Sequence, residues 1–288
     1  MAVLRGARPH PDDVRMSLGE HLAELRRRLI ISVLAVIAGT IVAFVFHHEI
    51  LHVLTRPYCN LPPSYRFDAT RCTLVVTGVL DAFTVTLKLS LYVGLVLSSP
   101  VWLWQIWKFV TPGLHQNERR YAVTFVATSV ALFAAGCVVA YFTLANGLHF
   151  LLSFATGGLT SLLTFDSYLS YVVAIVLVFA VSFEFPLVVI MLNLVNVLSY
   201  ERLRRWTRGV IFGIFAFAAV ATPTQDPFTM LALAVPITAL YGVSLAFAFV
   251  HDRRAARRGD TSPYAHLADD ELSPLDDEPA GSMSDPVP

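Results

Sequence analysis

A carboxyl group in the middle of an apolar stretch is the residue of this sequence with the clearest chemical potential. Glu184 lies in the segment Ser182-Phe183-Glu184-Phe185-Pro186. Inside a membrane, an ionisable side chain costs several kcal/mol unless it faces a wet cavity or a partner. Pro186 breaks the local helix and frees backbone groups near the carboxyl group. Two interpretations stay open: a functional polar contact, or a carboxyl group that is bonded within the protein for packing alone.

Enzyme motifs are missing from the sequence, which has no Gly-rich phosphate loop and no H-E-x-x-H, G-x-S-x-G or C-x-x-C pattern. The nine histidines are scattered. We therefore expect no catalytic residue, no cofactor and no metal site. Cys59 and Cys72 lie in a loop that we place outside the cytoplasm, where oxidation would allow a disulfide between them. Cys137 is expected to be a small apolar filler within a span.

The elements that position these residues are predicted to be membrane helices. Hydrophobic residues make up 56% and charged residues 15% of the 288 residues, and mean hydropathy is +0.62. Soluble domains have about 25% charged residues. The formal net charge of zero gives no indication of a nucleic-acid partner. Spans of about 20 apolar residues cross the hydrocarbon layer, and six stretches meet or approach that length: Leu29–Phe46, Ala82–Trp107, Tyr121–Ala145, Tyr168–Asn193, Gly209–Ala221 and Phe228–Val250.

The fifth stretch is the shortest, and at about 1.5 Å per residue it covers only about 20 Å. It must thin the bilayer or sit behind longer neighbours. Basic residues mark the cytoplasmic side of short loops. They concentrate before span one, after spans two and four, and after span six, at Arg26, Arg27, Arg28, Lys108, Arg119, Arg120, Arg202, Arg204, Arg205, Arg208, Arg253, Arg254, Arg257 and Arg258. This pattern predicts that both termini are cytoplasmic.

Three regions are expected along the chain: a cytoplasmic tail over 1–16, a transmembrane domain over 17–250, and a disordered cytoplasmic tail over 251–288. Ser17 and Glu20 form a capping box, from which an amphipathic interfacial helix leads into span one. Pro100, Pro186 and Pro236 lie inside spans, where they are expected to kink the helices and favour a concave bundle.

Three other charged residues have ordinary explanations beside functional ones. Asp226 precedes the last span in a tight turn, where a helix cap is the favoured interpretation. Lys88 could extend its ammonium group to the outer interface or have a functional role. Glu118 lies in a short cytoplasmic loop, where a carboxylate is ordinarily a solvated charge.

These features together resemble TatC, the multi-spanning receptor subunit of the twin-arginine protein translocase. The resemblance extends from about Ser17 to Val250. It rests on these motifs: His21-Leu22-x-Glu24-Leu25-Arg26, Arg56-Pro57, Ser99-Pro100 with Gln105-x-Trp107-x-Phe109, Glu118-Arg119-Arg120, Ser182-Phe183-Glu184-x-Pro186, and Thr222-Pro223 with Asp226.

The resemblance implies an all-α membrane protein whose six helices form a cupped bundle in the bacterial cell membrane. It implies a receptor for the twin-arginine signal peptides of folded precursors. Partners would be TatA- and TatB-like single-span proteins and further copies of the chain, and the proton-motive force would drive transport. Neither an enzymatic activity nor a nucleic-acid partner is implied.

Residue by residue, the resemblance gives Glu118 and Glu24 as the carboxylates that receive the arginine pair, with Phe109 as the nearby aromatic. Guanidinium groups pair bidentately with carboxylates, which makes this physically reasonable. Arg26 and Arg119 complete the expected signal-binding patch, where Arg26 would hold the first helix beside it.

The resemblance assigns the remaining residues to other parts of the protein. It places Glu184 on the concave side as an intramembrane partner contact, and it gives Pro57 and Asp226 loop-shaping roles. The alternatives are a proton-coupled secondary transporter for a small solute, with Glu184 as the coupling carboxylate, and a scaffold that docks a partner without transport.

Overall fold

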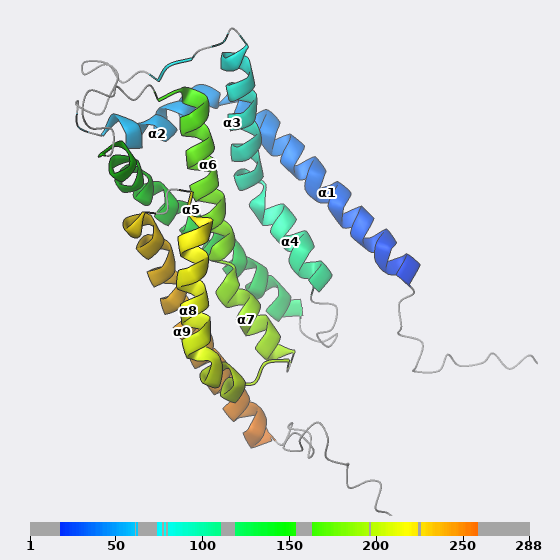
Figure 1. The fold of residues 1–288 in the computed structure, drawn as a ribbon. Helices are drawn as coiled ribbons and strands as arrows, with labels where there is room; N and C mark the ends of the chain where they lie inside the picture. Colours follow the sequence, from blue (N-terminus) through cyan, green and yellow to red (C-terminus); the bar gives the residue numbers. More distant parts are fainter. Residues whose placement is uncertain are drawn as a thin grey trace, which may run out of the picture.

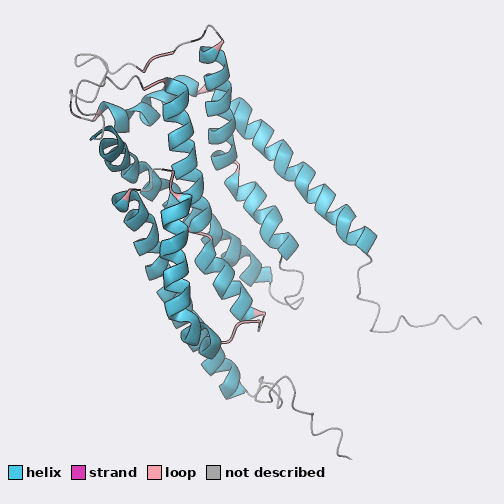
Figure 2. Cartoon of the chain, in the orientation of Figure 1, coloured by secondary structure: helices cyan, strands magenta, loops and turns pink. Residues whose placement is uncertain are grey.

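The computed structural model describes residues 18–60, 62, 74–76, 78, 80–110, 119–153, 163–195, 197–223 and 226–258. In these ranges the chain is helical apart from short connections and one isolated bridge between Val75 and Thr164 (Figure 2). Glu118 and Cys72 lie outside the described residues. The helices are α1 Leu18–Val45, α2 His47–Cys59, α3 Asp81–Leu97, α4 Ser99–Val110, α5 Arg119–Ser153, α6 Phe165–Ser182, α7 Phe185–Leu194, α8 Tyr200–Ala221 and α9 Pro227–Arg258.

The helices form an elongated bundle with α1 at one edge (Figure 1). α1 packs against α3 and α4, and α8 at the opposite edge packs against α9. Most of the main core comes from α5, α6, α8 and α9, and its fully buried large side chains include Leu144, Tyr168, Ile175, Phe179 and Leu233. Large apolar side chains also cover the outside, among them Phe212 and Val220, both of which are mostly exposed. Such a continuous apolar exterior is suited to lipid.

Four helical segments are long and apolar enough to cross a membrane, and the count is five if the bent pair α3 and α4 forms one span. The segments are α1, α5, the α6–α7 pair and α9. α8 contains the predicted fifth span but begins with a charged turn that includes Glu201, Arg202 and Arg204. In Figure 1 its upper end lies below that of α6. The sixth crossing therefore stays a prediction.

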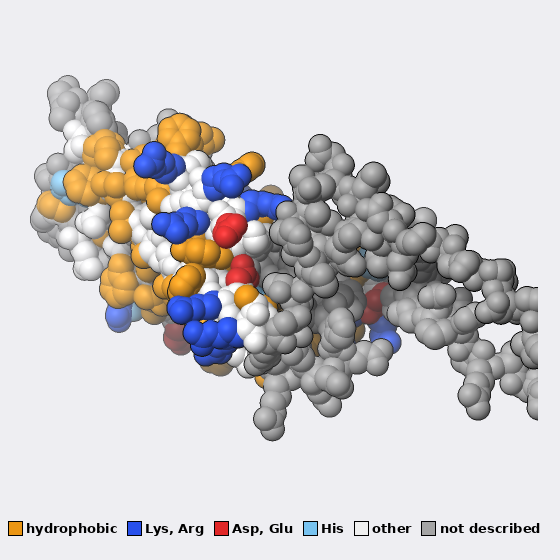
Figure 3. Space-filling model, turned by 90° about the horizontal axis from the view of Figure 1, so that it is seen from below, with side chains coloured by type: hydrophobic (Ala, Val, Ile, Leu, Met, Phe, Trp, Pro, Cys, Tyr) orange, Lys and Arg blue, Asp and Glu red, His pale blue; other side chains and the backbone are white. Residues whose placement is uncertain are grey.

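The basic residues gather at one end of the bundle. In Figure 1, the lower ends of the helices are the start of α1, the end of α4, the starts of α5 and α8, and the ends of α7 and α9. Figure 3 looks at this end, where blue side chains surround a few red ones. The helix directions thus bring together the residues that the sequence assigned to one side of the membrane. Which side of the membrane this end faces stays a prediction.

The three prolines that were expected to kink their helices differ in their effect on helix geometry. α3 and α4 meet at an angle of 54° next to Pro100. α6 ends and α7 begins around Glu184, with Pro186 in the first turn of α7. α9 instead runs through Pro236 without a break, because the loss of one backbone donor does not outweigh the packing on both sides of it. The expected concave shape stays a prediction.

Two boundaries differ from those expected. α1 is one continuous helix from Leu18, so the segment predicted as interfacial and span one form a single element. α9 continues to Arg258, and the predicted start of the disordered tail at residue 251 is therefore wrong by eight residues. The physical reason is a tertiary contact: Asp252 accepts hydrogen bonds from Asn193 Nδ2 at 3.0 Å and from the Tyr200 backbone N–H at 2.7 Å.

Candidate functional site

The first group of predicted site residues lies where the start of α1 meets the end of α4. The ring of His21 stacks on Phe109, with centroids 4.6 Å apart. Glu24 follows one turn later on α1 and accepts a hydrogen bond from Arg28 through Oε1. The structure thus places Glu24 and Phe109, predicted from separate motifs, in one patch. We call His21, Glu24, Arg28, Gln105 and Phe109 the α1–α4 patch.

Arg28 was not among the predicted site residues. Its Nη2 donates to Glu24, and its Nη1 donates to the backbone oxygen of Gln105 at a long 3.4 Å. The Arg28 side chain is 12% exposed, whereas that of Glu24 is 33% exposed. Arg28 therefore ties α1 to α4 and neutralises Glu24. The spacing of four residues between an acid and a following base indicates such a pair in a helix and could have revealed it.

The other predicted members of the patch are distributed differently. Arg26 is exposed and lies two residues from Glu24, a spacing that puts two side chains on different faces of a helix. The structure does not bring Arg26 to the contacts described for Glu24. Arg119 begins α5 at the same end of the bundle, but its side chain, like all of Glu118, lies outside what the structure describes.

The second site is the intramembrane carboxyl group of Glu184 at the break between α6 and α7. Ser129 on α5 donates a hydrogen bond to Glu184 Oε2 at 2.7 Å. Trp107 on α4 donates to Ser129 Oγ through Nε1 at 2.8 Å. Glu184 Oε1 is buried and has no hydrogen-bond partner among the described residues. Oε2 fits the interpretation of a carboxyl group that is bonded within the protein for packing. Oε1 fits the interpretation of a polar group that is available for a functional contact.

Asp226 immediately precedes α9, and its carboxylate Oδ1 accepts the Thr229 backbone N–H at 2.7 Å. Its side chain is fully buried. The prediction of a helix cap is confirmed. Pro57 is buried within α2, next to Tyr58, whose ring lies 6.0 Å from that of Tyr168. These contacts are suited to shaping the bundle.

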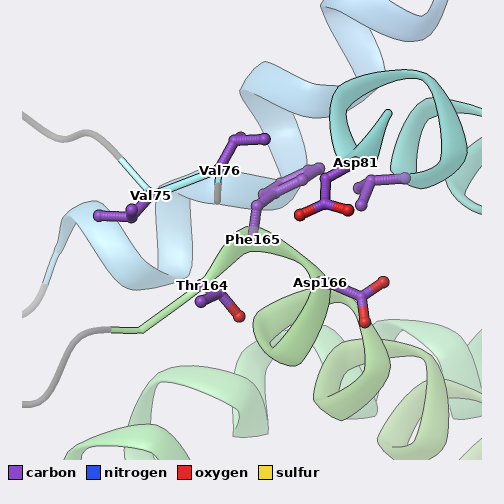
Figure 4. Close-up of a pocket in the computed structure, with 7 residues that line it drawn as sticks. Val75, Val76, Asp81, Thr164, Phe165 and Asp166 are labelled. Carbon is purple, nitrogen blue, oxygen red and sulfur yellow. The ribbon is translucent and has the colours of Figure 1, made fainter. Parts of the chain in front are cut away.

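A small pocket lies near the starts of α3 and α6 (Figure 4). It has a volume of about 30 Å³, which admits water but no larger solute. It is lined by Val75, Val76, Asp81, Val85, Thr164, Phe165 and Asp166. Beside it, Lys88 Nζ donates to Asp166 Oδ1 at 2.7 Å. This half-exposed ion pair accounts for Lys88 without a functional role.

The cysteines divide as the sequence suggested. Cys59 at the end of α2 is disulfide-bonded, and Cys137 on α5 is a free thiol. Because Cys72 lies outside the described residues, its pairing with Cys59 stays a prediction. Among the described residues, no cluster of three or more His, Cys, Asp or Glu side chains could hold a metal ion.

Comparison with known proteins gives a consistent result. The family model described as "Sec-independent protein translocase protein (TatC)" matches residues 20–236. A TatC protein from Frankia casuarinae is 54% identical over 270 residues, covering 92% of this chain and 74% of the relative. One from Corynebacterium kroppenstedtii is 42% identical over 293 residues, covering 95% and 70%. A chloroplastic relative from Arabidopsis thaliana is 36% identical over 232 residues, covering 80% and 66%.

Solved structures agree with the sequence relatives. A crystal structure of the twin-arginine translocase receptor TatC in DDM superposes with a TM-score of 0.66 at 32% identity, covering 80% of this chain and 99% of that one. A second crystal structure of the same receptor gives a TM-score of 0.65, also at 32% identity, covering 81% and 100%. The chain therefore belongs to the TatC family of Sec-independent protein translocase proteins.

Proposed function

We propose that this translocase subunit is the receptor for twin-arginine signal peptides. It recognises the arginine pair of a folded precursor at the basic end of the bundle and recruits TatA- and TatB-like single-span partners. The proton-motive force drives export. In this proposal the chain crosses the bacterial cell membrane six times with both termini in the cytoplasm, and it self-associates in a receptor complex.

The observation that supports the proposal most directly is the α1–α4 patch. It joins a partly exposed carboxylate, Glu24, to an aromatic pair at the end of the bundle where basic residues gather. Aromatic faces and carboxylates are the groups that a guanidinium binds, by stacking and by charge-assisted hydrogen bonds.

The charge balance assigns unequal roles to the two predicted carboxylates. Arg28 already offsets the charge of Glu24, and Lys108 and His21 also act on Glu24 electrostatically. The described part of the patch therefore has no surplus negative charge. The two arginines of a signal peptide need a surplus of negative charge to bind. Glu118 is the carboxylate that the sequence supplies in the adjoining loop. We infer that Glu118 provides the principal attraction, while Glu24 orients the approach.

Two other functions are alternatives to this proposal. Membership of the TatC family decides against a small-solute transporter. A scaffold that docks a partner without binding a signal differs from the proposal only in whether arginine-bearing cargo binds at Glu118.

Crosslinking in membranes separates these functions. A photoreactive twin-arginine signal peptide is offered to the wild type, to Glu118→Ala and to the control Glu201→Ala, which removes an exposed carboxylate from α8. We expect crosslinking to the wild type and to Glu201→Ala, and loss of crosslinking with Glu118→Ala or with a Lys-Lys peptide. Equal crosslinking of the Arg-Arg and Lys-Lys peptides to the wild type would refute the receptor proposal.

A further inference from the structure

α4 contacts both of the sites described above. On one side of this helix, the backbone oxygen of Gln105 accepts from Arg28 and the ring of Phe109 stacks on His21. On another side, Trp107 donates to Ser129, which donates to Glu184. The contacts to α1 and the contacts to α5 thus originate within five consecutive residues of one helix, 105–109.

The sequence spacing produces these two faces. Gln105 and Phe109 are four residues apart, as are Leu103 and Trp107, so each pair lies on its own side of the helix. Leu103 and Trp107 are buried in an apolar cluster against α5, where the Trp107 ring meets Phe125 edge-on at 4.6 Å. α4 is also separated from α3 by the 54° bend. It is therefore a short rigid segment that packs between α1 and α5 and has a joint at its upper end.

The hydrogen-bond chain from Trp107 to Glu184 depends on the position of α4. Trp107 and Ser129 are both buried, so no solvent can replace a lost bond, and a buried group left without its partner is costly. A small displacement of α4 would separate the indole N–H from Ser129 and release the hydroxyl group that holds Glu184 Oε2. Closely packed interfaces change between discrete arrangements rather than deform smoothly.

We propose that α4 couples the cytoplasmic signal site to Glu184: signal binding displaces α4, breaks the Trp107–Ser129–Glu184 chain, and frees the carboxyl group for a hydrogen-bond donor on a transmembrane partner. Trp107 and Ser129 are positioning residues in this mechanism. The inference deepens the proposed receptor function and rests on it.

Thermodynamic reciprocity provides the test. If signal binding breaks the Trp107–Ser129–Glu184 hydrogen bonds, then a mutation that removes these hydrogen bonds favours the signal-bound arrangement. It tightens signal binding by the same factor. Coupling between sites is commonly about 5-fold or more. A purely structural role of Ser129 predicts no such gain, because loss of packing weakens a binding site or leaves it unchanged.

The experiment measures the Kd of a fluorescent twin-arginine signal peptide for the purified full-length protein with its partners. Ser129→Ala removes the central hydroxyl group, and Trp107→Phe removes the indole donor while it keeps an aromatic ring. Ser244→Ala is the matched control, because Ser244 is equally buried and its hydroxyl group donates to Pro186 O at 3.0 Å, beside the same helix break but without contact to α4 in the described hydrogen bonds.

We expect Kd to fall about 5-fold for Ser129→Ala and Trp107→Phe, and to stay within about 2-fold of wild type for Ser244→Ala. In the Glu184→Gln background, Ser129→Ala should have a smaller effect than it has alone, because the two residues act in one chain. If one variant fails to insert, the other decides the outcome.

Unchanged or weaker binding in the inserted variants would overturn the coupling while the receptor function stands. A wild-type protein that does not distinguish the Arg-Arg peptide from the Lys-Lys peptide would overturn both. The two failures are therefore distinguishable from the same titrations.

Discussion

At the scale of single residues, the most informative feature is how each charge is balanced. Glu24 is neutralised by Arg28, Lys88 pairs with Asp166, and Asp226 caps a helix. Glu184 differs, because one of its oxygens is buried without a partner among the described residues. Among the carboxylates just named, Glu184 is thus the one with a buried oxygen left to accept a hydrogen bond in the described part of the chain.

The first prediction concerns Arg28. Replacing Arg28 by alanine should lower the thermal midpoint of the detergent-solubilised protein, since it removes the contact to Gln105 O and leaves Glu24 unpaired. Arg27→Ala is the control, because Arg27 is an exposed neighbour of the same type. Equal midpoints for the two variants, measured in the same detergent, would contradict a tying role for Arg28.

The second prediction concerns the buried cap of α9. Asp226→Ala removes the acceptor of the Thr229 N–H and should destabilise the protein by about 1–2 kcal/mol. Asp226→Asn keeps a side-chain oxygen at the cap and should cost less than the alanine variant. Denaturant or thermal unfolding in detergent measures both. Equal losses for asparagine and alanine would show that the charge, and not the capping oxygen, is what matters there.

At the scale of elements, helix interfaces depend on small residues. α1 and α3 approach so closely at Gly39 and Gly94 that a Cβ at Gly94 would lie 2.4 Å from the backbone nitrogen of Thr40, and one at Gly39 would lie 2.6 Å from Gly94 O. Close backbone approach through glycine is a common basis of helix packing in membranes, where apolar burial gives little driving force between helices. α1, with little other burial, depends on this contact.

The third prediction follows from that contact. Gly94→Ala should force α1 away from α3 and destabilise the protein by about 1–3 kcal/mol. Gly213→Ala on α8 is the matched control, because an added Cβ meets nothing within 4 Å there. It should be neutral or slightly stabilising, since alanine favours a helix by up to about 1 kcal/mol over glycine. Unfolding midpoints compare the two, and an unaffected Gly94→Ala would show that the interface can open without cost.

At the scale of the whole molecule, the helices form a series with a well-buried middle and exposed edges. The core lies among α5, α6, α8 and α9, whereas α1 contacts the rest through α2, α3 and α4. The basic end contains the α1–α4 patch, and the opposite end contains the Lys88–Asp166 pair. α4 connects the α1–α4 patch with Glu184 through the hydrogen bonds of Trp107 and Ser129, so events at one level of the membrane can reach another through few contacts.

The fourth prediction concerns how much of the C-terminal region the fold needs. Ending the chain after Arg258 should leave insertion, stability and export unchanged. Ending it after Val250 removes Asp252, and with it the contacts to Asn193 and to the start of α8, so the unfolding midpoint and the level of inserted protein should fall. Asp252→Ala in the full-length chain should reproduce part of this loss. Two truncations of equal stability would mean that α9 is complete by Val250.

The sequence by itself determined the class of protein, the family and the position of most helices, because membrane spans need long apolar runs and basic residues concentrate at their cytoplasmic ends. It also singled out Glu184 and Asp226 as charged groups near apolar stretches, and the resemblance to the family singled out Glu24 and Phe109. Their roles in signal binding stay predictions. It did not show α2, which replaces part of the first predicted loop, or the extent of α9 beyond Val250.

Only the tertiary structure decided which of these residues meet. The pairing of Trp107 with Ser129 spans 22 positions and that of Ser129 with Glu184 spans 55. Local periodicity gives no information at such separations, because these contacts depend on how the helices pack and on the bend before α4. Arg28 is a second example. Its spacing from Glu24 could be read from the sequence, but its burial and its contact with Gln105 could not. Burial in the folded bundle determines whether a charge is solvated, paired or available.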